Sequence, residues 1–117
     1  MNPAPEGDAL HLDRVVEAID LIRADLAGRS RDSFVCDRTV GDATALRLAA
    51  IGEASRKLSE ELRGRHPDIA WRQMYALRNI VAHHYFNLKY DLLWDIVAEH
   101  LDGLEAACRA ELKRIDG

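Results

Sequence analysis

Apolar residues recur at helical spacing along most of the chain and predict four helical segments. The first ends before Gly28, a residue typical of helix ends. The second runs from about 38 to 62, the third from about 69 into the residues near 83, and the last begins at Asp91. The apolar positions are Leu12, Val15, Val16, Ile19, Ile22 and Leu26, then Ala43, Leu46, Ala50, Ile51, Ala54, Leu58 and Leu62, and finally Leu92, Leu93, Ile96, Val97, Leu101, Leu104, Ala107 and Leu112.

Short polar stretches between these segments predict caps and turns. Asp8 is the expected N-cap of the first helix, and SRDSFVC at 30–36 is an expected short helix or turn that places Phe34 on the core. Pro67 and the 86–88 stretch are expected turns. No segment has the pattern of a strand. The predicted fold is an all-α antiparallel bundle of four to five helices, one domain over residues 1–117, with residues 1–7 flexible.

Composition narrows the class of protein. A chain of 117 residues matches one domain, and its net charge of -4 gives no global field toward nucleic acid or an anionic membrane, so any RNA contact must be local. Cys36 and Cys108 are too far apart in sequence for a metal motif, and both are expected to be buried free thiols. The first residues lack the features of a signal peptide, and no apolar run approaches the length of a membrane span, which predicts a cytoplasmic protein.

The stretch RNIVAHHY, residues 78–85, concentrates polar side chains in a helical context. At about 100° per residue, His84 continues the apolar stripe of the third helix and is expected on the core side. His83 shares a different stripe with Arg72 and Asn79, and the Asn79 amide can fix the tautomer of an imidazole one turn later. The two adjacent histidines are therefore not equivalent.

Arg78 lies about 140° from His83 on an ideal helix, so the two side chains meet only if the arginine wraps back or the helix ends. If the helix ends near His83, then Tyr85 can border the same cleft. Adjacent histidines point about 100° apart and have no Cys or carboxylate at ligand spacing, so a metal site is not predicted.

An arginine and a histidine without a serine or cysteine nucleophile suit cleavage of RNA by its own 2'-hydroxyl. This reaction needs a general base, a general acid and a cation that stabilises the phosphorane. One chain supplies one candidate histidine at the site, His83. A two-fold axis through the cleft would bring His83 and Arg78 from two copies around one phosphate, which predicts a homodimer.

The chain resembles the HepT-like toxins, a branch of the HEPN superfamily of small helical domains, in its R-x4-H-x-Y pattern. The pattern consists of Arg78, His83 after four intervening residues, and Tyr85 after one more. The segment from 51 to 97 resembles the middle and late parts of this family nearly throughout, and the resemblance extends over roughly the whole chain after its first ten residues. It implies an all-α homodimer that cuts RNA without metal or other cofactor.

The resemblance also implies roles for individual residues. Arg78 would stabilise the scissile phosphate, His83 would be the acid-base residue with His84 as its alternative, and Asn79 would orient His83 or the phosphate. A minimal nucleotidyltransferase antitoxin would neutralise the toxin by transferring AMP from ATP to Tyr85. Such modification adds bulk and negative charge where the substrate phosphate must lie.

Other residues have simpler expected roles. Tyr75 lies one turn before Arg78 and is expected to support it by packing. The remaining aromatic and imidazole side chains are expected to be core or interface anchors (Trp71, Trp94) and surface or capping residues (His11, His66, His100). Two alternatives to a nuclease stay open: a non-catalytic module that holds nucleotide or substrate for a nucleotidyltransferase, and a plain helical dimerisation domain.

Overall fold

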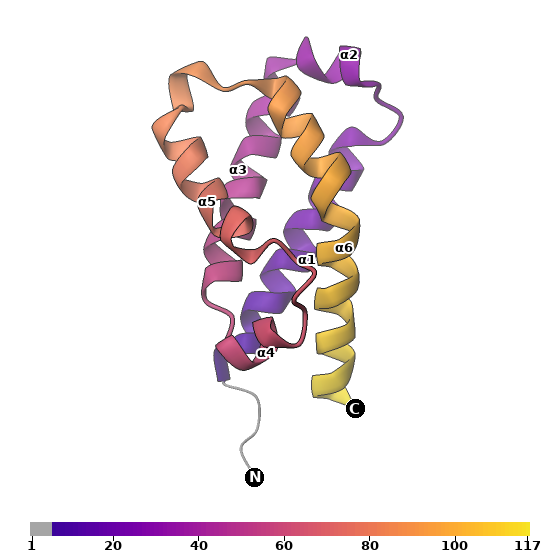
Figure 1. Ribbon diagram of the computed structural model, residues 1–117. Coiled ribbons are helices and arrows are strands. Elements are labelled where there is room, and N and C mark those ends of the chain that lie inside the picture. The colour runs from indigo at the N-terminus through magenta and orange to yellow at the C-terminus, as the bar shows by residue number, and fades with distance from the viewer. Residues whose placement is uncertain (1–5) are drawn as a thin grey trace.

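The computed structural model describes residues 6–117, and in that range the chain is all helical, as predicted (Figure 1). Four long helices form the bundle and are joined by shorter helical turns. The elements are α1 (Glu6–Leu26), α2 (Arg31–Val35), α3 (Arg38–Arg56), α4 (Glu60–Gly64), α5 (Trp71–His83), the 3-10 helix η1 (Tyr85–Asn87) and α6 (Tyr90–Asp116). No helix in residues 6–117 is long and apolar enough to cross a membrane.

Helix α3 is central to the packing, because it lies against α1 on one side and against α5 on the other. Helix α6 packs on α1, and α2 covers the end of the bundle that holds the start of α6. In Figure 1, α4 and the C-terminus lie at the bottom, whereas α5 leads up to the turn that precedes α6. The largest fully buried side chains include Leu12, Ile19, Ile22, Phe34, Leu48, Ile51, Leu62, Met74, Leu101 and Leu104.

The short connector after α1 follows its prediction. Gly28 has φ 75°, a left-handed conformation that ends α1 and that glycine adopts without strain. Ser30 caps α2, and reciprocal hydrogen bonds between Ser30 and Ser33 form a capping box. Phe34 is completely buried, and its ring lies 5.4 Å from that of Trp94. Trp94 is thus a core anchor, as expected.

Asp8 is not the N-cap of the first helix, because α1 already begins at Glu6. Its buried carboxylate instead accepts hydrogen bonds from the backbone N–H of Ser59 (2.9 Å) and from the Ser59 hydroxyl (2.7 Å). Asp8 therefore fixes the start of a different helix. Of the lead predicted to be flexible, Glu6 and Gly7 belong to α1, and residues 1–5 lie outside the described part of the chain.

The long helix predicted from 38 to 62 is divided into α3 and α4. The division has a local cause: Ser59 is extended, and its side chain accepts a hydrogen bond from the N–H of Leu62, which caps α4. Asp8 holds the same serine from across the bundle. Periodicity cannot detect this break, because Leu58 and Leu62 stay buried on both sides of it.

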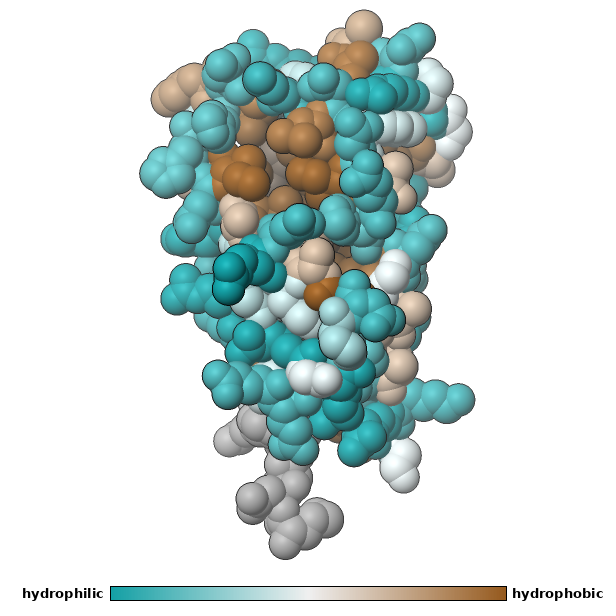
Figure 2. Space-filling model, viewed as in Figure 1, coloured by the Kyte–Doolittle hydropathy of each residue, from teal (hydrophilic) through white to brown (hydrophobic). Residues whose placement is uncertain are grey.

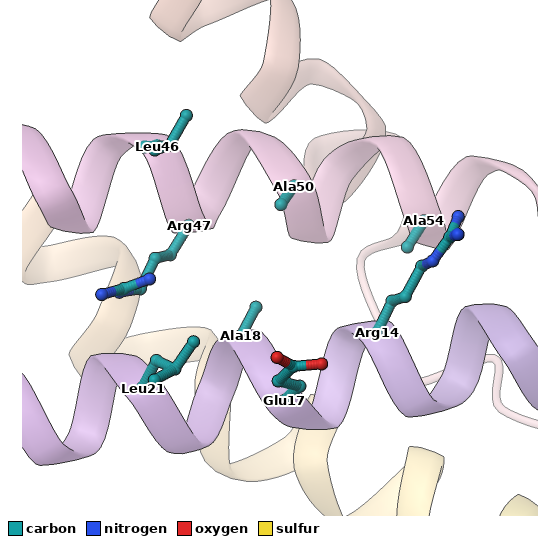
Figure 3. Close-up of a pocket in the computed structure, with 8 residues that line it drawn as sticks. All are labelled: Arg14, Glu17, Ala18, Leu21, Leu46, Arg47, Ala50 and Ala54. Atoms are coloured by element: carbon teal, nitrogen blue, oxygen red, sulfur yellow. The ribbon is translucent and has the colours of Figure 1, made fainter.

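Two residues of the predicted apolar face of α3 are exposed. Leu46 keeps 69% of its surface in solvent, and Ala50 is also exposed. Together with Leu21 of α1 they line a shallow groove of about 320 Å³ between α1 and α3, shown in Figure 3, with charged side chains at its rim. The buried face of α3 instead includes Ala45 and Leu48, which lie on a different side of the helix from Leu46 and Ala50.

The two cysteines differ. Cys108 is buried as predicted, and burial raises the pKa of its thiol to about 12. The prediction for Cys36 is wrong, because this residue follows α2 as its exposed C-cap. Apolar content alone cannot place a cysteine at a helix end.

Candidate functional site

Helix α5 ends at His83, where a cleft shared with Tyr85 needs the helix to end. The backbone of His84 leaves the helical region (φ -114°, ψ 21°), and its N–H donates to the carbonyl of Ile80 at 3.1 Å. The chain then makes one turn of 3-10 helix, η1, which contains Tyr85. Tyr85 therefore stands beyond the helix and not on its continued surface.

The end of α5 is open to solvent. His83 and His84 are exposed, and Tyr85 and Phe86 retain 67% and 93% of their surface. The prediction that His84 lies on the core side is wrong for this chain, because the helical stripe stops at the residue before it. The rings of Tyr85 and Phe86 pack edge to face on each other, 5.1 Å apart, which orders the turn locally.

Arg78 is held from α3. Its Nε lies 3.2 Å from Oε2 of Glu53, and Glu53 is also 3.5 Å from the ammonium of Lys57. The Arg78 side chain remains 56% exposed. The pair is therefore an open one that a phosphate oxygen can replace, since exposed ion pairs contribute only about 0–1 kcal/mol.

A glycine sets the distance between these two helices. A Cβ at Gly52 would lie 2.7 Å from the carbonyl oxygen of Met74 and 3.0 Å from the amide nitrogen of Arg78. Both are backbone atoms, which cannot move aside as the end of a side chain can. Gly52 thus permits α3 to approach α5 at the turn that carries Arg78.

Next to this contact is a cavity of about 230 Å³ between α3 and α5. Its lining comprises Gly52, Glu53, Arg56, Arg72, Tyr75, Ala76, Arg78 and Asn79. The structure therefore brings Arg78, Asn79 and Tyr75 to one place. His83 and Tyr85 are not among the residues that line it, so a cleft that unites Arg78, His83 and Tyr85 stays a prediction.

The family described as "Ribonuclease HepT-like" matches residues 15–111, which include all of α3 and α5. The chain belongs to the HepT-like ribonuclease family. The match includes every residue of the R-x4-H-x-Y motif.

Among relatives of this HepT-like chain, "Probable ribonuclease HepT" of Thermococcus cleftensis is 33% identical over 95 residues, 81% of this chain and 86% of that protein. "Putative RNase MJ1380" of Methanocaldococcus jannaschii is 40% identical over 68 residues, 58% and 62% of the two chains. "Putative RNase TTE0752" of Caldanaerobacter subterraneus is 25% identical over 104 residues, 89% and 93%. No solved structure matches the chain significantly.

Tyr75 of this HepT-like chain has a second arginine, Arg63, as its hydrogen-bond partner. Its hydroxyl accepts a hydrogen bond from Arg63 at 2.6 Å, and the same guanidinium lies 5.4 Å from the centre of its ring. Arg63 also donates to the carbonyl of Leu58 at 3.2 Å. Tyr75 thus fastens α5 to α4 while one side of it faces the cavity that holds Arg78.

A second group of arginine, histidine and glutamate lies at the other end of the HepT-like bundle. Glu111 of α6 is buried and accepts hydrogen bonds from Arg65 (2.6 and 3.1 Å), while His66 Nε2 lies 2.6 Å from its Oε2. Hydrogen bonding to the Arg65 guanidinium lowers the pKa of Glu111 and outweighs the desolvation by burial, which alone would raise it, and the His66 contact lowers it further.

His66 therefore has a specific partner, contrary to expectation. Glu111 lies 45 residues farther along the chain, and no spacing rule connects the two. Trp71, whose Nε1 donates to the carbonyls of Arg63 and His66, is a partly buried anchor as predicted. His11 and His100, which are expected to be surface or capping residues, are half-buried. Within residues 6–117, no three His, Cys, Asp or Glu side chains are grouped in a way that could hold a metal ion.

Proposed function

We propose that this chain is a metal-independent endoribonuclease and the toxin of a toxin-antitoxin pair. The observation that carries the proposal is the exposed motif at the end of α5 in a chain of the HepT-like ribonuclease family. Arg78 has an open carboxylate partner, His83 is exposed, and Tyr85 stands on the turn that follows. Three groups suited to phosphate chemistry are thus available to a large substrate such as RNA.

The proposed reaction uses the ribose 2'-hydroxyl of the substrate as nucleophile. One imidazole takes the proton of this hydroxyl, the 2'-oxygen forms a bond to phosphorus, and the bond from phosphorus to the 5'-oxygen breaks. A second, protonated imidazole donates its proton to the departing 5'-oxygen. The products are a 2',3'-cyclic phosphate and a 5'-hydroxyl. The planar guanidinium of Arg78 would bind the non-bridging oxygens of the phosphorane through two donors.

This mechanism needs two imidazoles, and we propose that His83 of two copies supplies them in a homodimer. An apolar gap between α5 and α6 supports the pairing: Ile80, Leu92 and Ile96 line a cavity of about 200 Å³ there. Figure 2 shows apolar surface at this place, and Leu92 is 46% exposed. A monomer gains nothing from apolar side chains left in water beside its motif, whereas a second copy would cover them.

We further propose that Tyr85 is the site of neutralisation by a minimal nucleotidyltransferase antitoxin. The phenol oxygen would attack the α-phosphorus of ATP, the bond to the β-phosphate would break, and AMP-tyrosine, pyrophosphate and the phenol proton would result. The 67% exposure of Tyr85 and its place on a single 3-10 turn favour access by a second enzyme. The attached phosphate would repel the RNA backbone from Arg78.

The nuclease proposal is tested with highly purified protein and RNA in the presence of EDTA. The parent should cut, and His83→Ala should lose about 10²–10⁴-fold in rate, as expected when an acid-base residue is removed. His84→Ala is the matched control, because it removes the neighbouring exposed imidazole and should keep most activity. If the parent cuts no RNA, the chain is not this nuclease, and the non-catalytic nucleotide-binding role takes its place. If His83→Ala cuts as well as the parent, His83 is not the acid-base residue, and the proposed mechanism fails.

The modification is tested by co-expression with a minimal nucleotidyltransferase antitoxin. The parent should be detoxified and gain the mass of AMP on Tyr85, whereas Tyr85→Phe should stay toxic. Relief of toxicity in both would mean that the antitoxin acts by binding, without the modification.

A further inference from the structure

The cavity between α3 and α5 has an excess of positive charge for which the proposed chemistry has no use. Three arginines line it, Arg56, Arg72 and Arg78, against one carboxylate, Glu53. The chain as a whole carries a net charge of -4, so this local excess of cations is opposite in sign to the protein average. One arginine is enough for the scissile phosphate, and the other two require an explanation.

Arg72 and Arg56 have open guanidinium groups. Both side chains belong to exposed residues, and within residues 6–117 neither has an ion pair or a side-chain hydrogen bond. By contrast, Arg23, Arg29, Arg47, Arg65 and Arg109 are all paired with carboxylates. Arg14 and Arg114 also have no carboxylate partner among the described residues, but Arg56 and Arg72 line one cavity together.

The position of Arg72 is also electrostatically unfavourable in the free protein. It is the second residue of α5, where the helix dipole presents its positive end, and the first turn of this helix contains no acidic residue. A cation at this place costs free energy that a bound anion would recover. Arg56, in contrast, ends α3 and by itself would be explained as a helix-end cation.

The direction of α5 connects this cavity with the motif. Arg72, Asn79 and His83 follow one stripe of the helix, and the rise of about 1.5 Å per residue puts Arg72 and His83 roughly 16 Å apart along its axis. That length exceeds one nucleotide of an RNA strand. A strand whose scissile phosphate lies by His83, at the Arg78 end of the cavity, can therefore place another of its phosphates beside Arg72.

We propose that Arg56 and Arg72 form a second phosphate-binding subsite, which holds the RNA backbone away from the bond that is cut. This inference rests on the proposed ribonuclease function. The two arginines bind substrate and do not touch the reacting atoms, so they contribute affinity and register along α5 but not acid-base chemistry. Because phosphate contacts carry no base information, the subsite is insensitive to sequence.

The test measures binding separately from cutting. The probe is a fully 2'-O-methylated oligonucleotide of about eight nucleotides, which cannot be cleaved, together with a dinucleotide of the same chemistry. Arg72→Gln and Arg56→Gln should each weaken binding of the longer probe about tenfold. Each should also lower the slope of log Kd against log salt by about 0.7, the value for one phosphate contact on a single strand. Dinucleotide binding should not change.

Arg114→Gln is the matched control, since it removes an exposed arginine near the C-terminal end of α6 and the same unit of charge. The subsite is refuted if Arg72→Gln and Arg56→Gln behave like this control, or if they weaken the dinucleotide and the longer probe equally. Loss of the dimer in either variant, measured by light scattering, would also refute it, because the arginines would then serve the interface. Failure of the nuclease proposal appears elsewhere, as absent cleavage or as an active His83→Ala variant.

Discussion

Two glutamates of this protein each hold an arginine, but in opposite surroundings. Glu53 and Arg78 lie on neighbouring helices with 40% and 56% of their side chains exposed. Glu111, with 5% exposed, binds Arg65 and His66 at the far end of the bundle through contacts of 2.6 to 3.1 Å. The same residue types thus form an open pair in one place and a closed cluster in the other.

The difference shows what separates a structural cluster from a site. Around Glu111, both carboxylate oxygens contact protein donors and the side chain is buried, so a ligand could reach the carboxylate only by breaking the packing of α6. Around Arg78, the only ion pair among the described residues is the exposed one with Glu53, and the cavity beside it is open. Residue type alone would have ranked the two equally.

The largest expected effect is on the rate of RNA cleavage and comes from a change in the exposed Glu53–Arg78 pair. Arg78→Ala should lower the rate of RNA cleavage by about 10²–10³-fold, because the removed guanidinium stabilises charge in the transition state. The free energy of unfolding of this variant should stay within about 1 kcal/mol of that of the parent, since the lost ion pair is exposed. Rates on a fluorogenic RNA and calorimetry measure the two quantities. A variant that melts early would mean that Arg78 is structural.

Glu111→Gln should lower the stability of the protein and leave its cleavage activity unchanged. The amide keeps the shape but loses the charge that binds Arg65 and His66, and we expect a loss of about 2–3 kcal/mol in the free energy of unfolding, measured by urea titration. RNA cleavage by the folded protein should be unchanged. Glu61→Gln, which affects only a solvent-exposed contact of Arg65 at 3.5 Å, is the control and should cost much less.

Gly52→Ala tests whether helix spacing positions Arg78. The added methyl would meet backbone on α5, so the helices must separate, at a cost of about 1–3 kcal/mol. Cleavage should fall as well, because the turn that carries Arg78 moves. Gly64→Ala adds the same methyl where no atom lies within 4 Å and should have neither effect. Full activity in a destabilised Gly52→Ala protein would show that the spacing matters for folding only.

The smallest effect is a dependence of stability on pH. The folded-state pKa of Glu111 is lowered, so its stabilisation is complete above the pKa of an unfolded glutamate, about 4.3, and is lost as the pH falls through the lowered folded value. The difference in melting temperature between the parent and Glu111→Gln should therefore shrink as the pH falls below about 4.3. A gap that widens in acid would contradict the assignment.

Most of the fold could be predicted from the sequence, because long amphipathic periods determine helices such as α1 and α6 and turn residues such as Gly28 end them. The break between α3 and α4 could not. It depends on Asp8, fifty-one residues away, which binds the Ser59 that caps α4. A contact between distant residues changes a helix boundary without changing the hydrophobic pattern.

The candidate site could be predicted only in part, because some of it depends on contacts between distant residues. The motif and the end of α5 follow from local sequence, and the structure has the helix end at His83. The burial of His84 was predicted wrongly, because a stripe on a helix has meaning only while the helix continues. The Glu53 partner of Arg78 and the open arginines of the cavity come from the packing of α3 on α5, for which one sequence contains no spacing rule.

The different exposure of the two cysteines permits labelling at a single site. Cys108 is buried and its thiol stays protonated near neutral pH, since its pKa is raised to about 12, whereas Cys36 is exposed at the end of α2. A maleimide dye added to the unaltered folded protein should therefore attach at one position. Mixing donor-labelled with acceptor-labelled protein would then report by energy transfer whether copies of this chain pair, and how quickly they exchange partners.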